Sequence, residues 1–152
     1  MGCCFSEEEI TTTAIVVAEY STTKPYRPVI TRGRAVKVYD GDTLWVAATP
    51  EGMVGNPVFR FNIRMLGYDS PEIRTKNPKE KEAAVKARDA LSELLSDKIF
   101  RIEQCEKSDK YGRLLATLYV NDNDGKVINV NKWMIEKGFG YPYDGGKKQD
   151  FM

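Results

Sequence analysis

Apolar and polar residues alternate in five short runs between residues 33 and 120, which is the pattern of half-buried β-strands. The runs are GRAVKVYD (33–40), DTLWVAAT (42–49), VFRFNIRML (58–66), KIFRIEQC (98–105) and GRLLATLYV (112–120). Asp40 and Gly41 lie between the first two runs and are the residue types that a tight hairpin turn favours. The alternation therefore predicts five strands, of which the first two form a hairpin.

Two further segments have the apolar spacing of amphipathic helices. The first begins at Asn77, an N-cap residue followed by Pro78, and its alanines and leucines recur to about Ser96. The second is NKWMIEK (131–137), which Gly138 ends as a C′ glycine. NDNDGK (121–126) predicts a turn, and residues 140–152 predict no regular structure.

Residues 1–28 differ in composition from the rest of the chain. They mix charges, Thr/Ser clusters and prolines, and only residues 14–18 are apolar, which predicts a short strand. We expect an N-terminal tail or linker over 1–28, one domain over 29–145 and a C-terminal tail over 146–152. Five short strands with an inserted helix fit an OB-type barrel, so the expected fold class is α+β, mainly β.

The total composition limits the chemistry that the chain can perform. The 152 residues include 23 basic and 22 acidic side chains, so net charge predicts no general attraction to nucleic acid. The sequence contains no histidine, which excludes histidine-dependent catalysis and histidine metal sites. A hydrolase of this composition would use carboxylates, lysine, arginine, tyrosine, hydroxyls, thiols or a hard cation bound by oxygen ligands.

Three acidic residues are candidates for holding such a cation. Asp42 is an extra carboxylate beside the hairpin turn, and Asp69 and Glu72 flank Ser70-Pro71 at the end of the third predicted strand. Proline stiffens that loop and can direct Asp69, the Ser70 carbonyl and Glu72 toward one point. The alternative is ordinary turn chemistry, because Asp and Ser-Pro are common in loops for local hydrogen bonding.

Basic and aromatic residues could complete a phosphate site. Arg64 lies in the third predicted strand and Arg113 at the start of the fifth, and two guanidinium groups can clamp a phosphodiester. The loop residues that could stack on a base or bond a phosphate are Lys110, Tyr111, Tyr141 and Tyr143. The alternatives are exposed strand arginines and tyrosines that pack on the barrel.

Four motifs, taken together and in order, resemble the family of staphylococcal nuclease (thermonuclease). They are YDGDTL (39–44), RMLGYDSPE (64–72), SDKYGR (108–113) and NKWMIEKGFGYPY (131–143), and the resemblance extends from about Arg34 to Tyr143. It implies an OB-fold barrel with packed helices and a calcium-dependent phosphodiesterase that cuts DNA and RNA and leaves 3′-phosphate ends. The third, C-terminal helix of staphylococcal nuclease has no counterpart here, so we expect two helices.

The resemblance also implies roles by motif position. It implies one calcium ion, with Asp42 and Asp69 as carboxylate ligands and Ser70 supplying a backbone carbonyl. Glu72 would activate the attacking water, and Arg64 and Arg113 would contact the scissile phosphate. The residues implied as substrate contacts are Lys110, Tyr111, Tyr141 and Tyr143. The expected substrate is DNA or RNA, preferably single-stranded, and the expected oligomeric state is a monomer.

The first six residues, MGCCFS, match the pattern for N-myristoylation at Gly2, and the adjacent Cys3 and Cys4 could be palmitoylated. Some plant calcium-dependent nucleases of the resembled family also have acylatable starts. A pair of acyl chains would anchor the protein to the cytoplasmic face of a membrane, although anionic lipids would repel the acidic residues 7–9. No secretory signal and no membrane-spanning apolar run is recognisable, so the expected location is intracellular, with or without this anchor.

Two functions of different classes fit these observations. One is a calcium-dependent nuclease, and the other is an OB-type module that binds nucleic acid or protein without cutting. Binding alone does not require the combination of carboxylates and arginines, which favours the nuclease. A local basic patch would attract the substrate, and its candidate members are Arg74, Lys76, Lys79, Lys81, Lys107 and Lys110.

Overall fold

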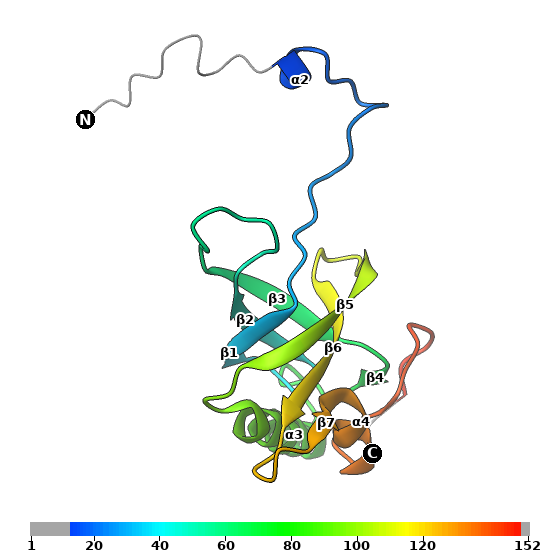
Figure 1. Cartoon of the computed structure of the whole chain (residues 1–152). Helices are drawn as coiled ribbons and strands as arrows, with labels where there is room; N and C mark the ends of the chain where they lie inside the picture. Colours follow the sequence, from blue (N-terminus) through cyan, green and yellow to red (C-terminus); the bar gives the residue numbers. More distant parts are fainter. Residues whose placement is uncertain (1–12, 150–152) are drawn as a thin grey trace, which may run out of the picture.

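Five strands form a barrel at the centre of the structure, a computed structural model that describes residues 13–149 (Figure 1). They are β1 (Arg32–Val38), β2 (Thr43–Ala48), β3 (Phe59–Met65), β5 (Phe100–Ser108) and β6 (Leu114–Asn121). Antiparallel pairings join β3, β2, β1, β5 and β6 in that order, and a parallel pairing of β3 with β6 closes the barrel. The predicted mainly β, OB-type α+β fold is confirmed.

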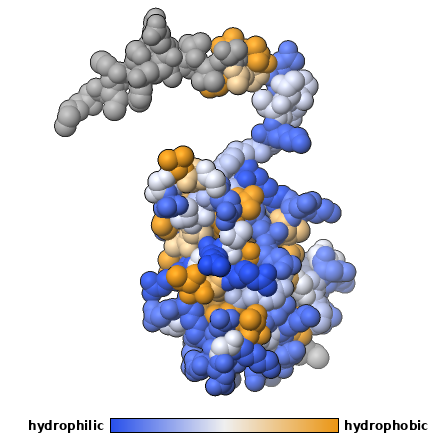
Figure 2. All heavy atoms as spheres, viewed as in Figure 1, coloured by the Kyte–Doolittle hydropathy of each residue, from blue (hydrophilic) through white to orange (hydrophobic). Residues whose placement is uncertain are grey.

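The barrel closes because inward-facing residues alternate with outward-facing ones along each strand. On β2, Leu44 and Val46 are fully buried, whereas Trp45 between them is half-buried on the outer face. The outer surface is mostly polar in Figure 2, where apolar residues form small separate groups on the visible face. None of the described helices combines the length and apolar character needed to cross a membrane.

Helix α3 (Pro78–Leu95) lies at the lower end of the barrel in Figure 1 and contacts β1. Its N-cap is the predicted one: Oδ1 of Asn77 accepts hydrogen bonds from the backbone N–H of Lys79 (3.0 Å) and Glu80 (3.4 Å). Ala87 and Leu91 are buried on its barrel-facing side. The predicted start and the predicted amphipathic face of this helix are both confirmed.

Helix α4 (Val130–Glu136) is attached to the barrel by the buried Asn131. Nδ2 of Asn131 donates to the carbonyls of Leu66 (2.8 Å) and Ala116 (3.1 Å), and its Oδ1 accepts from the amide of Leu118 (3.0 Å). Gly138 follows the helix with a φ of 76°, a left-handed conformation that glycine adopts without strain. The predicted short helix and its C′ glycine are confirmed.

The structure corrects the predictions for the shortest elements. Residues 14–18, expected as a strand, begin within the helix α2 (Thr13–Val16), so the described residues contain three helices rather than two. A lone strand leaves its backbone groups unpaired, whereas a helical turn pairs them locally. β7 (Val127–Asn129) pairs antiparallel with β6, and β8 (Tyr141–Pro142) pairs with β4 (Tyr68–Asp69), where no strands were expected. Two or three residues are too few to show alternation in a sequence.

Candidate active site

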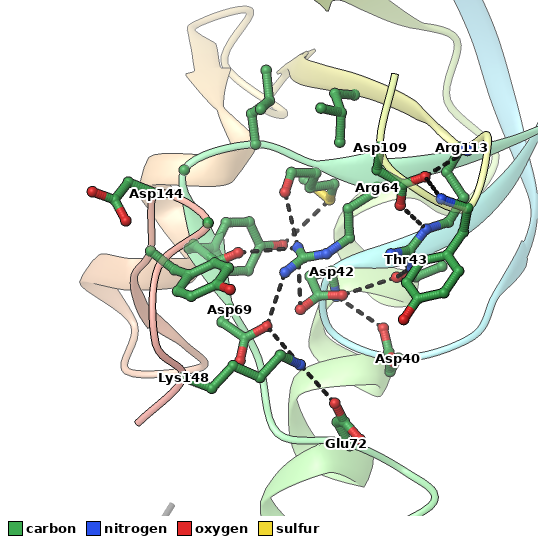
Figure 3. Close-up of a pocket in the computed structure, with 18 of the residues that line it drawn as sticks. Asp40, Asp42, Thr43, Arg64, Asp69, Glu72, Asp109, Arg113, Asp144 and Lys148 are labelled. Carbon is green, nitrogen blue, oxygen red and sulfur yellow. Dashed lines mark hydrogen bonds and ion pairs between the residues drawn. The ribbon is translucent and has the colours of Figure 1, made fainter. Parts of the chain in front are cut away.

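A cleft of about 1360 Å³ is lined by four segments that lie far apart in the sequence (Figure 3). The segments are the β1–β2 turn with the start of β2, the stretch from β3 through 74, the β5–β6 loop and residues 141–149. The predicted site residues that line it are Asp42, Arg64, Asp69, Glu72, Lys110, Tyr111, Arg113, Tyr141 and Tyr143. Of the predicted basic patch, Arg74 and Lys110 line the cleft, and Lys76, Lys79, Lys81 and Lys107 are not among its lining residues.

Arg64 connects the two buried aspartates. Its Nη1 lies 3.2 Å from Oδ2 of Asp42, and its Nη2 lies 2.9 Å from Oδ1 of Asp69. Nη1 also donates to the carbonyls of Met65 (2.9 Å) and Tyr68 (3.0 Å). Only 12% of the Arg64 side chain is exposed, so these bonds hold the guanidinium in one orientation at the floor of the cleft.

Thr43 links Arg113 to the same cluster. The Thr43 hydroxyl donates to Oδ1 of Asp42 (2.9 Å) and accepts from Nη1 of Arg113 (3.2 Å). Asp109 holds the other side of the guanidinium, because its Oδ2 accepts from Nε of Arg113 (2.5 Å). Arg64 on β3 and Arg113 in the β5–β6 loop therefore line one cleft. Asp42 contacts Arg64 directly and is linked to Arg113 through Thr43.

Asp109 also shapes the loop that carries the substrate-contact candidates. Its Oδ1 accepts from the backbone N–H of Tyr111 (2.9 Å) and of Arg113 (2.8 Å). Burial alone would raise the pKa of Asp109, but the hydrogen bonds from Arg113 outweigh burial, and the pKa is lowered. The Tyr111 ring is 71% exposed, with Nζ of Lys110 5.0 Å and Cζ of Arg113 5.5 Å from its centroid.

Asp40 adds a third buried carboxylate beside Asp42. Oδ1 of Asp40 accepts from the backbone N–H of Asp42 (3.2 Å), and both residues are buried. Burial and then the charge of Asp42 raise the pKa of Asp40 to about 7. The β1–β2 turn thus concentrates negative charge that the nearby guanidinium of Arg64 only partly offsets.

Gly41 has a different role from the predicted one. Its φ is not positive, so a left-handed turn is not the reason for glycine here. A Cβ at this position would lie 2.8 Å from the Cβ atoms of both Ala87 and Ser70, closer than real Cβ contacts. The Gly41 carbonyl also accepts from the hydroxyl of the buried Tyr68 (2.5 Å). Glycine is required because α3 and the 68–70 strand end pack directly against the turn.

Ser70 lies behind Asp42 and is not among the cleft-lining residues. Its backbone N–H donates to Oδ2 of Asp42 (2.8 Å), which fixes the carboxylate from the barrel side. The hydroxyl of Ser70 is buried without a hydrogen-bond partner within residues 13–149. The assignment of its carbonyl as a metal ligand stays a prediction.

Lys148 extends over the acidic residues from the C-terminal segment. Its Nζ lies 2.6 Å from Oε1 of Glu72 and 3.4 Å from Oδ1 of Asp69. Burial alone would lower the pKa of Lys148, but the hydrogen bond to Glu72 and the two negative charges outweigh burial and raise it. The Tyr141 hydroxyl donates to Oδ2 of Asp69 (3.1 Å), so the predicted Tyr141 also contacts the cluster.

The described residues hold no group of three or more carboxylate or thiol side chains arranged as a ready metal site. The donor set is nevertheless the kind that a hard cation selects, because Asp42 and Asp69 are buried carboxylates and no cysteine is among the described cleft-lining residues. Both carboxylates contact cationic side chains, so each already balances a positive charge at this site. These residues fit a divalent cation that takes its remaining ligands from water and substrate.

Sequence reasoning missed Thr43, Asp109, Lys148 and Tyr68. Thr43 lies in the motif YDGDTL and Asp109 in SDKYGR, so both belong to recognised motifs. The sequence alone does not show that both contact Arg113. Lys148 lies in a segment without a pattern, and only the fold brings it near Glu72. The predicted acylation residues Gly2, Cys3 and Cys4 lie outside the described residues, and their modification stays a prediction.

The family comparison agrees with this site. The family model of staphylococcal nuclease homologues matches residues 62–150, more than half of the 152 residues. The chain therefore belongs to the family of staphylococcal nuclease homologues, a nuclease and nucleic-acid-binding family, and the resemblance is confirmed. The matched region begins after Asp42, which the structure nevertheless places against Arg64.

A relative in the archaeon Methanocaldococcus jannaschii is also similar to this chain. It is named "Uncharacterized protein MJ1439" and is 33% identical over 130 residues. The match covers 73% of this chain and 58% of the relative, so the chain spans somewhat more than half of that protein's length.

Proposed function

We propose that this chain is a calcium-dependent phosphodiesterase that cuts DNA and RNA, with single strands preferred, and leaves 3′-phosphate ends. The observation that carries the proposal is the connection of Arg113, Thr43, Asp42, Arg64 and Asp69 at the floor of one cleft. It brings two guanidinium groups and two carboxylates together from strands and loops that are far apart in the sequence. Binding alone needs no such arrangement, whereas phosphodiester hydrolysis needs both charges at one point.

The two arginines would bind the scissile phosphate. Each guanidinium can pair with two phosphate oxygens and keeps its charge at any working pH. Arg64 is held by carbonyls and carboxylates and Arg113 by Asp109 and Thr43, so both are oriented before substrate arrives. Such fixed donors stabilise the extra negative charge of a pentacoordinate phosphorus without reorganising.

Asp42 and Asp69 are the residues that would hold a calcium ion. When bound, calcium would neutralise phosphate charge and help to lower the pKa of a nearby water. Glu72 is the proposed general base, because its side chain is 56% exposed and lies at the same rim of the cleft. It would accept the proton of the attacking water as the new bond to phosphorus forms. The bond from phosphorus to the 5′-oxygen would break, that oxygen would leave as a hydroxyl by taking a proton from solvent, and the phosphate would stay on the 3′-oxygen.

The preference for single strands has support in the rim of the cleft. Tyr111 is 71% exposed beside Lys110, and the half-buried Tyr141 and Tyr143 also line the cleft. Exposed tyrosines can stack on unpaired bases, whereas a duplex keeps its bases stacked on each other. Tyr143 is kept in place by a hydrogen bond from its hydroxyl to the carbonyl of Gly146 (2.7 Å).

The proposal is tested by incubating single- and double-stranded DNA and RNA with calcium, magnesium or a chelator and by analysing the product ends. The proposed function predicts cleavage with calcium, none with chelator, and 3′-phosphate ends. The alternative, a module that binds without cutting, predicts intact substrate in every buffer together with retained single-strand binding.

A further inference from the structure

The outer face of the β2–β3 ladder continues away from the active site. Thr43 pairs with Arg64, Trp45 with Asn62, and Ala47 with Arg60. On β2, the half-buried Trp45 and Ala47 alternate with the buried Leu44 and Val46. Because side chains alternate along a strand, the three pairs lie on one face of the ladder, and Thr43 at its active-site end is itself buried. Successive pairs are roughly 6.7 Å apart along the strands. The catalytic candidate Arg64 and its strand partner Thr43 thus form the first of three pairs that lead to Trp45 and Arg60.

A groove of about 460 Å³ lies along this surface. Asn62, Tyr111 and Arg113 line both the groove and the active-site cleft, so the two are continuous. The other wall is formed by residues 26–28, which are attached to β5 through Gln104: its Nε2 donates to the carbonyl of Pro28 (3.0 Å). The groove is therefore built from the barrel and from the segment that precedes it.

The lining of the groove is positively charged and rich in aromatic residues. Its arginines are Arg27, Arg60 and Arg113, and its aromatic residues are Tyr26, Trp45, Phe61 and Tyr111. No acidic residue lines it, although the chain has 22 acidic residues and a net charge of only +1. Cζ of Arg60 lies 5.1 Å from the centroid of the Trp45 ring, so a guanidinium and an indole lie close together in the groove. Interleaved arginines and aromatics are what a single-stranded nucleic acid track requires.

Two polar atoms in the lining have no hydrogen-bond partner among the described residues. They are Nε of Arg27, a donor, and Oδ1 of Asn62, an acceptor, and both are buried. Nη2 of Arg27 donates to the carbonyl of Cys105 (3.2 Å), so the side chain is oriented while its Nε stays unpaired. Buried polar atoms in folded proteins are generally paired with protein, water or ligand. Both atoms belong to residues that line this one groove.

We propose that this groove, defined by Tyr26, Arg27, Trp45, Arg60 and Tyr111, is a subsite for nucleotides of the single strand that continues beyond the scissile phosphate. This inference rests on the proposed function, because it extends the same strand out of the cleft. A base stacks on Trp45 or Tyr111, and Arg60 and Arg27 neutralise the adjoining phosphates. The occupant is nucleic acid rather than an acidic peptide because the rings of Trp45 and Tyr111 can stack on bases, and because the groove shares Arg113 with the phosphate site.

The subsite can be tested through the fluorescence of Trp45. The chain has two tryptophans, so Trp133→Phe leaves Trp45 as the only indole. Trp133 lies against Phe139 in α4 and the following turn, with ring centroids 6.0 Å apart, and is absent from the groove. An oligothymidylate of about ten nucleotides, within the site size of an OB fold, is titrated into the full chain in chelator. Stacking on Trp45 predicts that the oligonucleotide quenches its emission.

Affinities of variants are then measured by the anisotropy of the same labelled oligonucleotide. Trp45→Ala is expected to weaken binding about fivefold or more, the lower end for loss of one base–aromatic stack, and Trp45→Phe to restore most of it. Arg60→Ala is expected to weaken binding roughly two- to fivefold. The matched control is Arg101→Ala, which also removes an exposed arginine stacked on a ring (Tyr119, 4.1 Å) but outside the groove. It is expected to bind as the unsubstituted chain does.

The outcomes separate this inference from the proposed function. Quenching and the predicted order of affinities in chelator support the subsite even if no substrate is ever cut. Binding without quenching, or equal losses in Arg60→Ala and Arg101→Ala, would overturn it while leaving calcium-dependent cleavage intact. Quenching by polyglutamate to the same extent would also overturn it, because charge alone would then explain binding.

Discussion

Nζ of Lys148 lies 2.6 Å from Oε1 of Glu72, so a lysine of the C-terminal segment is paired with the proposed general base. The same ammonium lies 3.4 Å from Oδ1 of Asp69, a proposed calcium ligand. A cation at this position competes with a metal ion for the negative charge of both carboxylates. The contact therefore links the end of the described chain to calcium binding.

Replacing Lys148 by alanine is expected to raise the affinity for calcium. The lysine side chain is 52% exposed, so its ion pairs are partly screened and their loss is expected to change affinity only roughly two- to fivefold. The measurement is calorimetric titration with calcium in the absence of nucleic acid. Lys147→Ala is the matched control, because Lys147 also lines the cleft but has no ion pair among the described residues. Weaker calcium binding in Lys148→Ala would contradict this account.

Asp109 is expected to be a positioning residue for Arg113. In Asp109→Asn, the amide oxygen still accepts from the loop backbone, but the charge that holds the guanidinium is lost. We expect a fall of about tenfold in the cleavage rate, as for a lost hydrogen bond to a charged group. Asp122→Asn is the control, because Oδ1 of Asp122 accepts from the N–H groups of Asp124 (2.9 Å) and Lys126 (2.8 Å) at the same spacing without an arginine pair. Equal effects of the two substitutions would show that loop structure alone matters.

The effect of Asp109→Asn on the stability of the fold is expected to depend on pH. Because the folded-state pKa of Asp109 is lowered, its ionised form stabilises the fold above the ordinary carboxyl value of 3.8. This stabilisation is lost as the pH falls through the lowered folded-state pKa. The melting temperature of Asp109→Asn should therefore lie below that of the unsubstituted chain at about pH 6, and the gap should narrow toward about pH 3. A gap that widens in acid would contradict the assignment.

A methyl group at position 41 is expected to separate the turn from α3. In Gly41→Ala the new Cβ would lie 2.8 Å from the Cβ atoms of Ala87 and Ser70. Neither atom is the end of a flexible side chain that could move away. Overpacking of this kind typically lowers the free energy of unfolding by about 1–3 kcal/mol. Gly146→Ala is the control, since its nearest neighbour is a carboxylate oxygen of Asp144 at 3.3 Å. Chemical denaturation measures both, and an unchanged midpoint for Gly41→Ala would refute the packing argument.

Calcium is expected to stabilise the fold through Asp42. At a concentration about a hundredfold above its Kd, calcium should raise the melting temperature by roughly 5–10 °C. Asp42→Asn should lose most of this increase, because the carboxylate contributes the charge that attracts the ion. Asp144→Asn removes another cleft-lining carboxylate that the proposal does not use, and it should keep the increase. An identical increase in Asp42→Asn would place the ion elsewhere.

The fold was predictable where the pattern is long and local. Alternation over six to nine residues identified all five barrel strands, and the Asn77-Pro78 cap identified the start of α3. The strands β4 and β8 were not predictable, because their pairing depends on where the barrel places Tyr68 and Tyr141. A two-residue strand has no period of its own, so only its partner defines it.

The residues of the candidate site could be predicted from the sequence, but the hydrogen bonds and ion pairs between them could not. The motifs contained Asp42, Arg64 and Arg113, and the structure brings them to one cleft. The link from Asp42 to Arg113 through the Thr43 hydroxyl could not be inferred from the sequence. A threonine after Asp-Gly-Asp is also an ordinary first residue of a strand, so it does not indicate a hydrogen-bonding role. The ion pair of Lys148 depends on the path of a segment without pattern, and Gly41 was attributed to a turn when its real constraint is contact with a distant helix.

The most direct test is calcium-dependent cleavage of single-stranded DNA by the full chain and by Glu72→Gln, with analysis of the product ends. The account predicts that the unsubstituted chain cuts with calcium, stops in chelator and leaves 3′-phosphate ends. It predicts a rate at least about a hundredfold lower for Glu72→Gln, the range of a lost general base. Cleavage that persists in chelator, ends that carry 5′-phosphate, or full activity in Glu72→Gln would contradict it.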